Sequence, residues 1–330
     1  MSQDHPYRRF HLPRDAPFEL RPSSPGKGWG GFATRFIKRG EKILTEKPLF
    51  VIPKPSEHIT EEDVLAAVAR LTPVEKFRVS LLRDNADEPF KTGQGALAEN
   101  SFALPACSGH GLFLLHSRFN HSCIPNARVP DPIDGIISLF AITDIMPGEE
   151  ITFCYIPDFS CRIRSERHEA LRFVCNCKAC LLGTPSQQLS DARRKFIRGL
   201  QYLTHGVDFD GKRQDASSPI IADRKLKQAA ESLSVPLSNR LIYLLLSLYL
   251  LDEEGLLDHL QRERLEPSVA AITSLFQAKS NAEIVKTAMA QTTWLGKVLV
   301  AFRLYGQYDA ADEFLPELLR VLRSREVVRL

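Results

Sequence analysis

The sequence predicts an α+β protein in which a strand-rich region is followed by a helical one. Residues 25–182 contain many short extended segments divided by glycine and proline turns, a pattern typical of small sheets. From Ser190 onward the extended segments stop, and apolar residues recur at helical spacing. A cysteine cluster, Cys175-Asn-Cys-Lys-Ala-Cys180, lies just before this change. We therefore expect a loosely ordered lead-in (residues 1–19), a strand-rich domain (residues 20–183) and a helical domain (residues 184–330).

Length and composition limit the classes of protein to which the chain can belong. A chain of 330 residues is long for one hydrophobic core, which favours two domains. The net charge of +3 is too small to indicate direct nucleic-acid binding. The first residues do not resemble a secretory signal, and the apolar run from Leu241 to Leu251 is too short to span a membrane. We therefore expect a protein with no membrane segment.

Glycines dominate the first motif, Pro25-Gly-Lys-Gly-Trp-Gly-Gly-Phe-Ala-Thr34. Such a backbone turns sharply and approaches a ligand closely, although many glycine turns are only hairpins. No helix opens directly after the glycines, which argues against a phosphate-binding loop. Residues 36–41 are expected to form a turn, and Lys42–Ile52 is expected to form a strand.

A helical insert (residues 56–99) is predicted next. Thr60-Glu-Glu-Asp63 indicates the start of one helix, and Pro73 starts a second that reaches Leu82. Asp84–Gly95 is expected to be a loop, and Ala98–Leu104 to be extended.

The strands are expected to resume after this insert. Asp134-Gly135 predicts a hairpin that joins strands at 127–129 and 136–141. Residues 144–149 are expected to turn, and residues 150–155 to form a further strand.

Helical periodicity covers most of the C-terminal half. Phe302–Ala311 is similar to the turn of a tetratricopeptide unit, but no strict 34-residue period is visible. Residues 206–219 are expected to form a flexible loop. The segments expected to be helical are 192–203, 224–233, 238–251, 267–277 and 282–304.

The cysteine cluster predicts a zinc site. Its C-x-C-x-x-C spacing offers three thiolates, whereas a closed structural zinc site needs four ligands. Cys123 lies in the segment Arg118-Phe-Asn-His-Ser-Cys-Ile-Pro-Asn126, and we take it as the fourth ligand beside Cys175, Cys177 and Cys180. The alternative is that these thiols are simply buried. An odd total of seven cysteines, three of them clustered, favours metal over disulfides and therefore a reducing compartment, nucleus or cytosol.

Taken together, the glycine turn, the Asn-His-Ser-Cys segment, the Gly-Glu-Glu-Ile-Thr-x-x-Tyr stretch and the cysteine cluster resemble a SET-domain protein lysine methyltransferase. More narrowly, the chain is similar to the SET-and-MYND family and its fungal relatives. The resemblance covers residues 20–182 and implies a SET fold with a β-clip, a pseudoknot and a post-SET zinc region at residues 171–183. The MYND finger of that family is missing, because the insert holds no cysteine and only one histidine, His58.

The resemblance also implies a cofactor site, a catalytic tyrosine and a metal site. S-adenosylmethionine would be bound by Lys27, Gly28, Trp29, Asn100, Asn120, His121 and Phe173. Tyr155 matches the active-site tyrosine of the family, and the four cysteines match its zinc ligands. The competing interpretations are a core tyrosine at Tyr155, a buried structural histidine at His121, and core aromatic residues at Trp29 and Phe173.

The expected function is methyl transfer to a lysine of a histone or non-histone protein, performed by a monomer in the nucleus or cytoplasm. Many family members place an aromatic residue where this chain has Leu171, which leaves activity and the methylation state of the product open. The alternatives are a catalytically weak adaptor that binds cofactor, zinc and protein partners, and a zinc-binding module alone. Basic residues near the cluster could meet an acidic partner, but more often such residues form a solvated helix face: Arg162, Arg164, Arg167 and Arg172.

Overall fold

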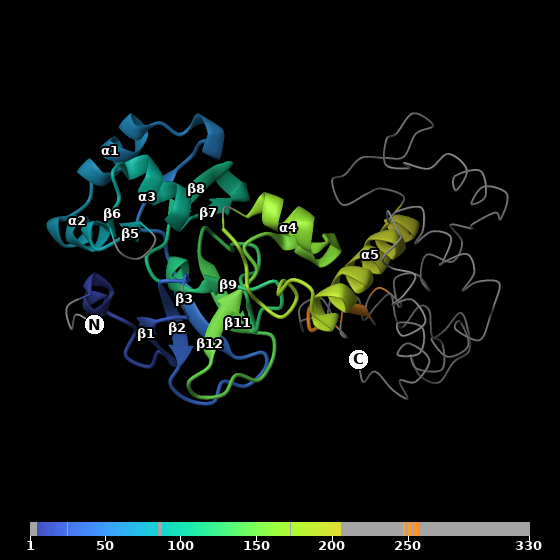
Figure 1. Cartoon of the computed structure of the whole chain (residues 1–330). Helices are drawn as coiled ribbons and strands as arrows, with labels where there is room; N and C mark the ends of the chain where they lie inside the picture. The colour runs from blue at the N-terminus through green and yellow to red at the C-terminus, as the bar shows by residue number, and fades with distance from the viewer. Residues whose placement is uncertain are drawn as a thin grey trace, which may run out of the picture. The chain divides into compact units, whose positions relative to one another are not determined.

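The computed structural model describes residues 5–24, 26–84, 88–171 and 173–205, together with residues 247, 250–251 and 254–257 (Figure 1). The chain divides into two compact units, Met1–Phe153 and Cys154–Leu330. Among these residues, none of the helices combines the length and hydropathy that crossing a membrane requires.

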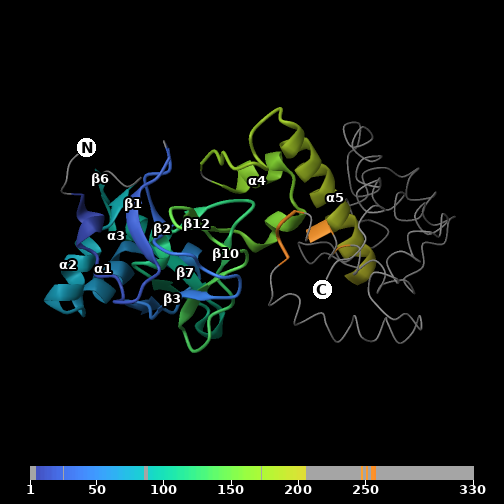
Figure 2. The same ribbon diagram turned by 90° about the horizontal axis from the view of Figure 1, so that it is seen from below.

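The largest sheet of the first unit has four strands in the order β1-β2-β12-β9. Its strands are β1 (Phe18–Pro22), β2 (Trp29–Ala33), β12 (Glu150–Phe153) and β9 (Asn120–His121). β2 pairs antiparallel with both β1 and β12, and these strands lie side by side in Figures 1 and 2. β9 pairs in parallel with β12, so that Asn120 faces Thr152 and His121 faces Phe153. The sheet therefore brings the glycine turn, the Asn-His-Ser-Cys segment and the Gly-Glu-Glu stretch together.

Two three-stranded sheets complete most of the first unit. One is β10-β11-β3 and the other is β4-β8-β7. Their strands are β3 (Lys42–Glu46), β4 (Val51–Ile52), β7 (Ser101–Leu104), β8 (Gly109–Leu112), β10 (Ala127–Arg128) and β11 (Ile137–Ala141). Short 3₁₀ turns join some of these elements, at Ser56–His58, Pro105–Cys107 and His116–Arg118.

The predicted hairpin between β10 and β11 is confirmed. Asp134 and Gly135 have φ values of 51° and 72°, and Ile133 pairs with Ile136 across them. Two consecutive positive φ values suit a tight hairpin turn, which explains the Asp-Gly pair. The prediction of one strand over 42–52 is wrong, because pairing stops at Glu46 and resumes at Val51. Pro48 lies between the two strands. Proline has no N–H, so it cannot donate a hydrogen bond to a neighbouring strand.

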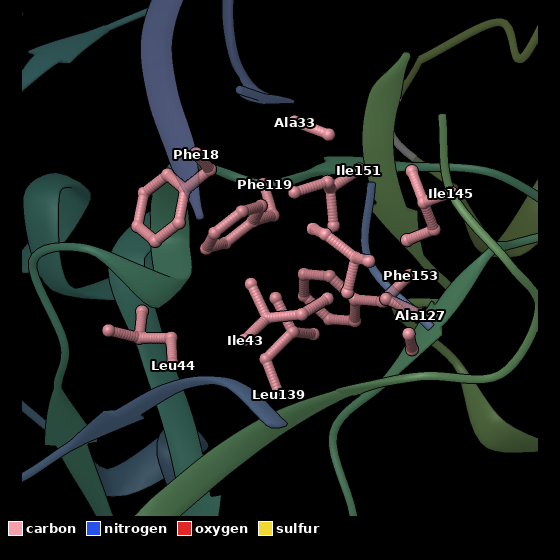
Figure 3. Packing of buried hydrophobic residues seen from close by; sticks show 12 residues of the cluster. Phe18, Ala33, Ile43, Leu44, Phe119, Ala127, Leu139, Ile145, Ile151 and Phe153 are labelled. Carbon is pink, nitrogen blue, oxygen red and sulfur yellow. The ribbon is translucent and has the colours of Figure 1, made fainter. Parts of the chain in front are cut away.

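The main hydrophobic core lies against the four-stranded sheet and the β10-β11-β3 sheet (Figure 3). Phe119, at its centre, is 1% exposed and meets Phe18 edge-on at a centroid distance of 4.9 Å. The cluster consists of Phe18, Ala33, Ile37, Ile43, Leu44, Phe119, Ala127, Leu139, Ala141, Ile145, Ile151 and Phe153. Nearly every strand that carries a motif is therefore anchored in one core.

The helical insert begins as the sequence predicts. α1 (Glu61–Ala69) and α2 (Pro73–Ser80) both start at capping boxes, on Thr60 and Thr72. The predictions for the end of the insert are wrong. β5 (Arg83–Asp84) pairs with β6 (Glu88–Pro89), and α3 (Gly93–Asn100) occupies residues expected to be loop and strand. The Glu61 carboxylate accepts hydrogen bonds from the first N–H groups of α3, which no local pattern reveals.

The lead-in is not loosely ordered from His5 onward. A 3₁₀ turn, η1, covers Pro6–Arg9, and Tyr7 is only 2% exposed. The Tyr7 hydroxyl donates to the carbonyl of Arg83 at 3.2 Å and accepts from its N–H at 3.1 Å. Phe10 is buried beside Tyr7 in a second apolar cluster with the insert helices. Aromatic burial therefore orders a segment whose proline and arginine content predicts the opposite.

The second unit contains η5 (Pro157–Cys161), α4 (Arg164–Ala170) and α5 (Pro185–His205). The helix predicted over 192–203 is confirmed, although it starts earlier, with Pro185 as its first residue. The Thr184 hydroxyl accepts from the N–H of Gln187 at 3.2 Å and so caps α5. The predicted helices at 224–233, 267–277 and 282–304, the loop at 206–219 and the tetratricopeptide-like turn lie outside the described residues, as does most of 238–251.

Candidate functional site

Four cysteines lie close enough to hold one metal ion. The sulfur atoms of Cys123, Cys175, Cys177 and Cys180 are all within 4.8 Å of one another. Tetrahedral zinc with Zn–S bonds of about 2.3 Å places its sulfur atoms about 3.8 Å apart, so the arrangement suits zinc after a small contraction. Cys123, Cys175 and Cys180 are each at most 3% exposed. The structure therefore brings together the ligand set that the sequence predicts.

Local hydrogen bonds shape the two peptide segments that carry these sulfurs. The N–H groups of Cys180 and Leu181 both donate to the carbonyl of Cys177, at 2.8 and 3.0 Å, and close the C-x-x-C turn. Near Cys123, the Asn126 side chain donates to the carbonyl of Glu150 at 2.9 Å and accepts from the N–H of Thr152 at 2.8 Å. The Asn126 side chain thus makes the pair of hydrogen bonds to the β12 backbone that a neighbouring strand would make.

Glu150 is the centre of a polar cluster that the sequence pattern alone does not reveal. Its carboxylate accepts from the Ser23 hydroxyl at 2.7 Å, the Asn120 side-chain amide at 2.7 Å and the Lys27 ammonium at 3.3 Å. A Cβ at Gly30 would lie 2.5 Å from a Glu150 carboxylate oxygen, so a side chain at this position would displace that carboxylate. Lys27 and Asn120, both predicted cofactor residues, are therefore held together by one carboxylate of the Gly-Glu-Glu stretch.

Trp29 joins the same cluster through its backbone. Its carbonyl accepts from the Asn120 side chain at 3.2 Å, and the preceding Gly28 has a φ of 67°. The indole ring itself stacks on His5, with centroids 4.2 Å apart, and meets the edge of Tyr7 at 6.2 Å. The ring is therefore packed against the N-terminal segment, and the Trp29 carbonyl is what joins the polar cluster.

Asn100 lies at the last position of α3 and is 2% exposed. Its amide donates to the carbonyl of Ala96 at 2.8 Å, and its carbonyl oxygen accepts from the guanidinium of Arg118. Arg118 in turn lies 4.4 Å over the ring of Tyr7, whose edge contacts Trp29. Asn100 is thereby connected to the glycine turn through Arg118 and Tyr7, for which the sequence alone indicates no role.

His121 and Cys123 contact each other directly. The His121 ring nitrogen Nε2 lies 3.2 Å from the Cys123 sulfur, and His121 is 3% exposed. A buried structural histidine and a cofactor-site histidine both agree with this position. The contact nevertheless connects the predicted cofactor residues on β9 to the cysteine cluster.

Tyr155 and Phe173 form an exposed aromatic pair in the second unit. Their ring centroids are 6.2 Å apart with an interplanar angle of 75°, and the residues are 43% and 45% exposed. Such exposure contradicts the alternative that either residue is a core aromatic. Leu171, by contrast, is only 8% exposed. The structure thus places Tyr155 and Phe173 beside each other and exposed to solvent, whereas the Leu171 side chain is buried.

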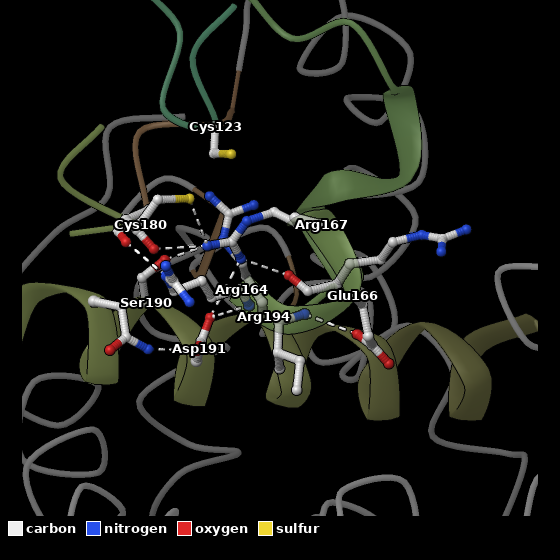
Figure 4. Close-up of polar contacts among 12 residues, drawn as sticks. Cys123, Arg164, Glu166, Arg167, Cys180, Ser190, Asp191 and Arg194 are labelled. Carbon is white, nitrogen blue, oxygen red and sulfur yellow. Dashed lines mark hydrogen bonds and ion pairs between the residues drawn. The ribbon is translucent and has the colours of Figure 1, made fainter. Parts of the chain in front are cut away.

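The basic residues before the cysteine cluster do not all form a solvated face. Arg167 is fully buried, and Asp191 of α5 lies 3.3 Å from it (Figure 4). Burial raises the pKa of Asp191, although the Arg167 guanidinium beside it acts in the opposite direction. Arg172 lies outside the part of the chain that the structure describes.

Two further cysteines are expected to be chemically inert. Burial raises the pKa of the Cys154 and Cys161 thiols to about 11, so at pH 7.5 roughly one thiol in 3,000 is ionised. We predict that iodoacetamide will label exposed Cys107 in the native protein and leave Cys154 and Cys161 unlabelled. Mass spectrometry of the digested protein, with a denatured sample as control, checks this result. Labelling of all three at one rate would contradict it.

Comparison with known proteins defines the class of domain first. Residues 28–156 match the family described as SET domain, so the chain carries a SET domain built of short strands and a few helices. This confirms the family resemblance drawn from the motifs.

Individual relatives are named protein-lysine methyltransferases. The chain is 44% identical over 94 residues to protein-lysine N-trimethyltransferase SMYD5 of Danio rerio, a match that covers 26% of this chain and 21% of that protein. It is 45% identical over 83 residues to the Homo sapiens SMYD5, covering 23% and 19%. Histone-lysine N-methyltransferase set5 of Schizosaccharomyces pombe is 30% identical over 177 residues, covering 52% and 53%. The chain thus spans about half of set5 and about one fifth of each SMYD5.

Proposed function

We propose that the protein is an S-adenosylmethionine-dependent protein-lysine N-methyltransferase that acts on a histone or non-histone protein. The observation that carries this proposal is the SET-domain match over residues 28–156. It includes the glycine turn from Gly28 onward, the Asn-His-Ser-Cys segment and Tyr155. The names of the relatives support the same reaction.

Several side chains and backbone groups would hold the cofactor. Phe173 is 45% exposed and offers the open ring face that stacking on adenine requires. A Cβ at Gly26 would meet nothing within 4 Å, which leaves open space beside the glycine turn. The residues that would form the site are Lys27, Gly28, Trp29, Asn100, Asn120, His121 and Phe173.

Methyl transfer to lysine depends mainly on positioning and on an uncharged amine. When bound, S-adenosylmethionine supplies a methyl group on a sulfonium centre. A free lysine has a pKa near 10.4, and an apolar environment next to a cation lowers it. We propose that the Tyr155 hydroxyl orients the target amine, which is consistent with its exposure. The reaction then requires no carboxylate base.

We propose a structural role for zinc at the four cysteines. All four positions would be filled by protein thiolates, which leaves none open for water or substrate. Because such a site forms only in the folded chain, metal binding would stabilise the peptide segment that carries Phe173, two residues before Cys175. The zinc would thereby order one side of the cofactor site.

The second candidate function is a catalytically weak adaptor that keeps the cofactor and zinc sites. Leu171 supports it, because a buried leucine occupies the position where the family resemblance leads us to expect an aromatic residue. In both cases the partner is a protein, and we propose a monomer that does not bind nucleic acid directly. Nucleus and cytoplasm both remain proposed locations.

Two measurements test these proposals together. Calorimetry with S-adenosylmethionine is expected to show binding, and transfer of a radiolabelled methyl group to histones or lysate proteins is expected to show activity. Binding without transfer would favour the adaptor. Absence of binding by the zinc-loaded protein would overturn both functions. Mass spectrometry of labelled products then identifies the modified lysine and its methylation state.

A further inference from the structure

Arg167 is a permanent charge placed in a fully buried position on α4. Its Nη2 donates to the carbonyl of Ala179 at 2.6 Å and to the sulfur of Cys180 at 3.4 Å. Its Nη1 donates to the carbonyl of Arg162 at 2.6 Å and lies 3.3 Å from Asp191 (Figure 4). One side chain therefore contacts a predicted metal ligand, the peptide before that ligand, and α5.

A second arginine of α4, Arg164, also contacts Cys180, at the end of the C-x-x-C turn. Arg164 lies three positions before Arg167, so both side chains lie on one face of the helix. The Arg164 Nε donates to the carbonyl of Cys180 at 2.7 Å, and its backbone N–H donates to Asp191 at 2.8 Å. Arg164 thus reaches only the backbone of Cys180, whereas Arg167 reaches the sulfur.

The charge of the proposed metal site explains why an arginine belongs there. Four thiolates around Zn²⁺ carry a net charge of about −2, and buried charge is costly unless it is paired and hydrogen-bonded. Cys123, Cys175 and Cys180 are at most 3% exposed, so water offers them little compensation. A buried guanidinium with an N–H directed at one sulfur supplies both the opposite charge and a hydrogen bond.

We propose that Arg167 is a positioning residue of the metal site: it holds Cys180 through an N–H···S hydrogen bond, offsets the charge of the thiolates and slows loss of the metal. This inference rests on the proposed zinc site. Asp191 orients Arg167 from α5 and does not itself contact a ligand.

The test measures zinc affinity of the full-length Arg167→Met protein by competition with a chromophoric chelator. Methionine keeps much of the length of arginine but removes the charge and all the donors. Loss of a group that orients a metal ligand typically weakens affinity 10- to 100-fold, so we expect a Kd for zinc raised by about that factor. The matched control is Arg162→Met. The Arg162 guanidinium pairs with Asp158, which is not one of the proposed metal ligands. Its Kd is expected to stay at the wild-type value.

Cobalt substitution gives a readout that a merely structural role would not change. A hydrogen bond to a thiolate lowers the energy of its lone pairs and so raises the energy of sulfur-to-cobalt charge transfer. The Co²⁺ charge-transfer bands of Arg167→Met are therefore expected at longer wavelength than those of wild type and Arg162→Met. Should Arg167→Met not fold, Arg167→Lys replaces it, since a compact ammonium cannot make all these contacts and should release zinc faster.

Wild-type affinity and spectrum in folded Arg167→Met, or wild-type zinc release from Arg167→Lys, would overturn the inference. A wild-type protein that binds no zinc would overturn both the inference and the proposed zinc site. The two failures are therefore distinguishable in one experiment.

Discussion

Replacing Tyr155 with phenylalanine is expected to slow methyl transfer about 100-fold or more while cofactor affinity stays unchanged. The substitution removes only the hydroxyl that would orient the target amine. It keeps the ring that contacts Phe173 at 6.2 Å. Because positioning supplies most of the catalysis in an in-line displacement, a misdirected amine costs rate more than binding. Single-turnover transfer with excess enzyme measures the chemical step directly.

The control for Tyr155 removes a different tyrosine hydroxyl. Tyr202 belongs to α5 and lies outside the SET-domain match, so Tyr202→Phe is expected to retain the wild-type rate. Transfer by Tyr155→Phe at the wild-type rate would remove Tyr155 from the proposed mechanism. Loss of cofactor binding in Tyr155→Phe would instead indicate a structural role.

Removing zinc is expected to abolish binding of S-adenosylmethionine. Zinc contributes about 10–16 kcal/mol to the folding of small tetrahedral sites at pH 7, far more than any one hydrogen bond in this region. Without metal, no ion would hold the four cysteine sulfur atoms together, and the segment before Cys175 that carries Phe173 would lose its anchor. Calorimetry before and after chelation, with zinc content measured by mass spectrometry, checks the coupling.

Single cysteine variants separate the metal site from a general effect of losing a thiol. Cys123→Ser is expected to reproduce the loss of zinc and of cofactor binding. Cys107→Ser is expected to keep both, because Cys107 is exposed and is not one of the four clustered cysteines. Stoichiometric cofactor binding by metal-free protein would show that the proposed zinc does not order the cofactor site.

Features that depend on neighbours in the sequence were predictable. The capping boxes at Thr60 and Thr72 and the hairpin turn at Asp134-Gly135 all satisfy backbone geometry with residues at most three positions apart. The grouping of Cys123 with the later cysteines was also predictable, because zinc chemistry demands a fourth ligand. Family resemblance pointed to the same residue.

Features that depend on distant partners were not predictable from local pattern. The start of α3 is capped by Glu61, more than thirty positions earlier in the chain. Tyr7 orders the N-terminal segment by packing in a cluster with the insert helices and by hydrogen bonding to Arg83, more than seventy positions later. Arg167 and Glu150 look like ordinary charged residues until the fold surrounds them with complementary groups.

Adjacent glycines in β2 couple the apolar interior to the polar cluster on Glu150. Successive positions of a strand point to opposite faces, and a Cβ at Gly31 would lie 2.4 Å from the Phe119 ring, just as one at Gly30 would collide with Glu150. At Gly30 and Gly31 the strand therefore has no side chain on either face, and its backbone alone separates Phe119 from Glu150. Substitutions that shift Phe119 to raise thermal stability should therefore displace Lys27 and Asn120 as well, and so change the affinity for the proposed cofactor.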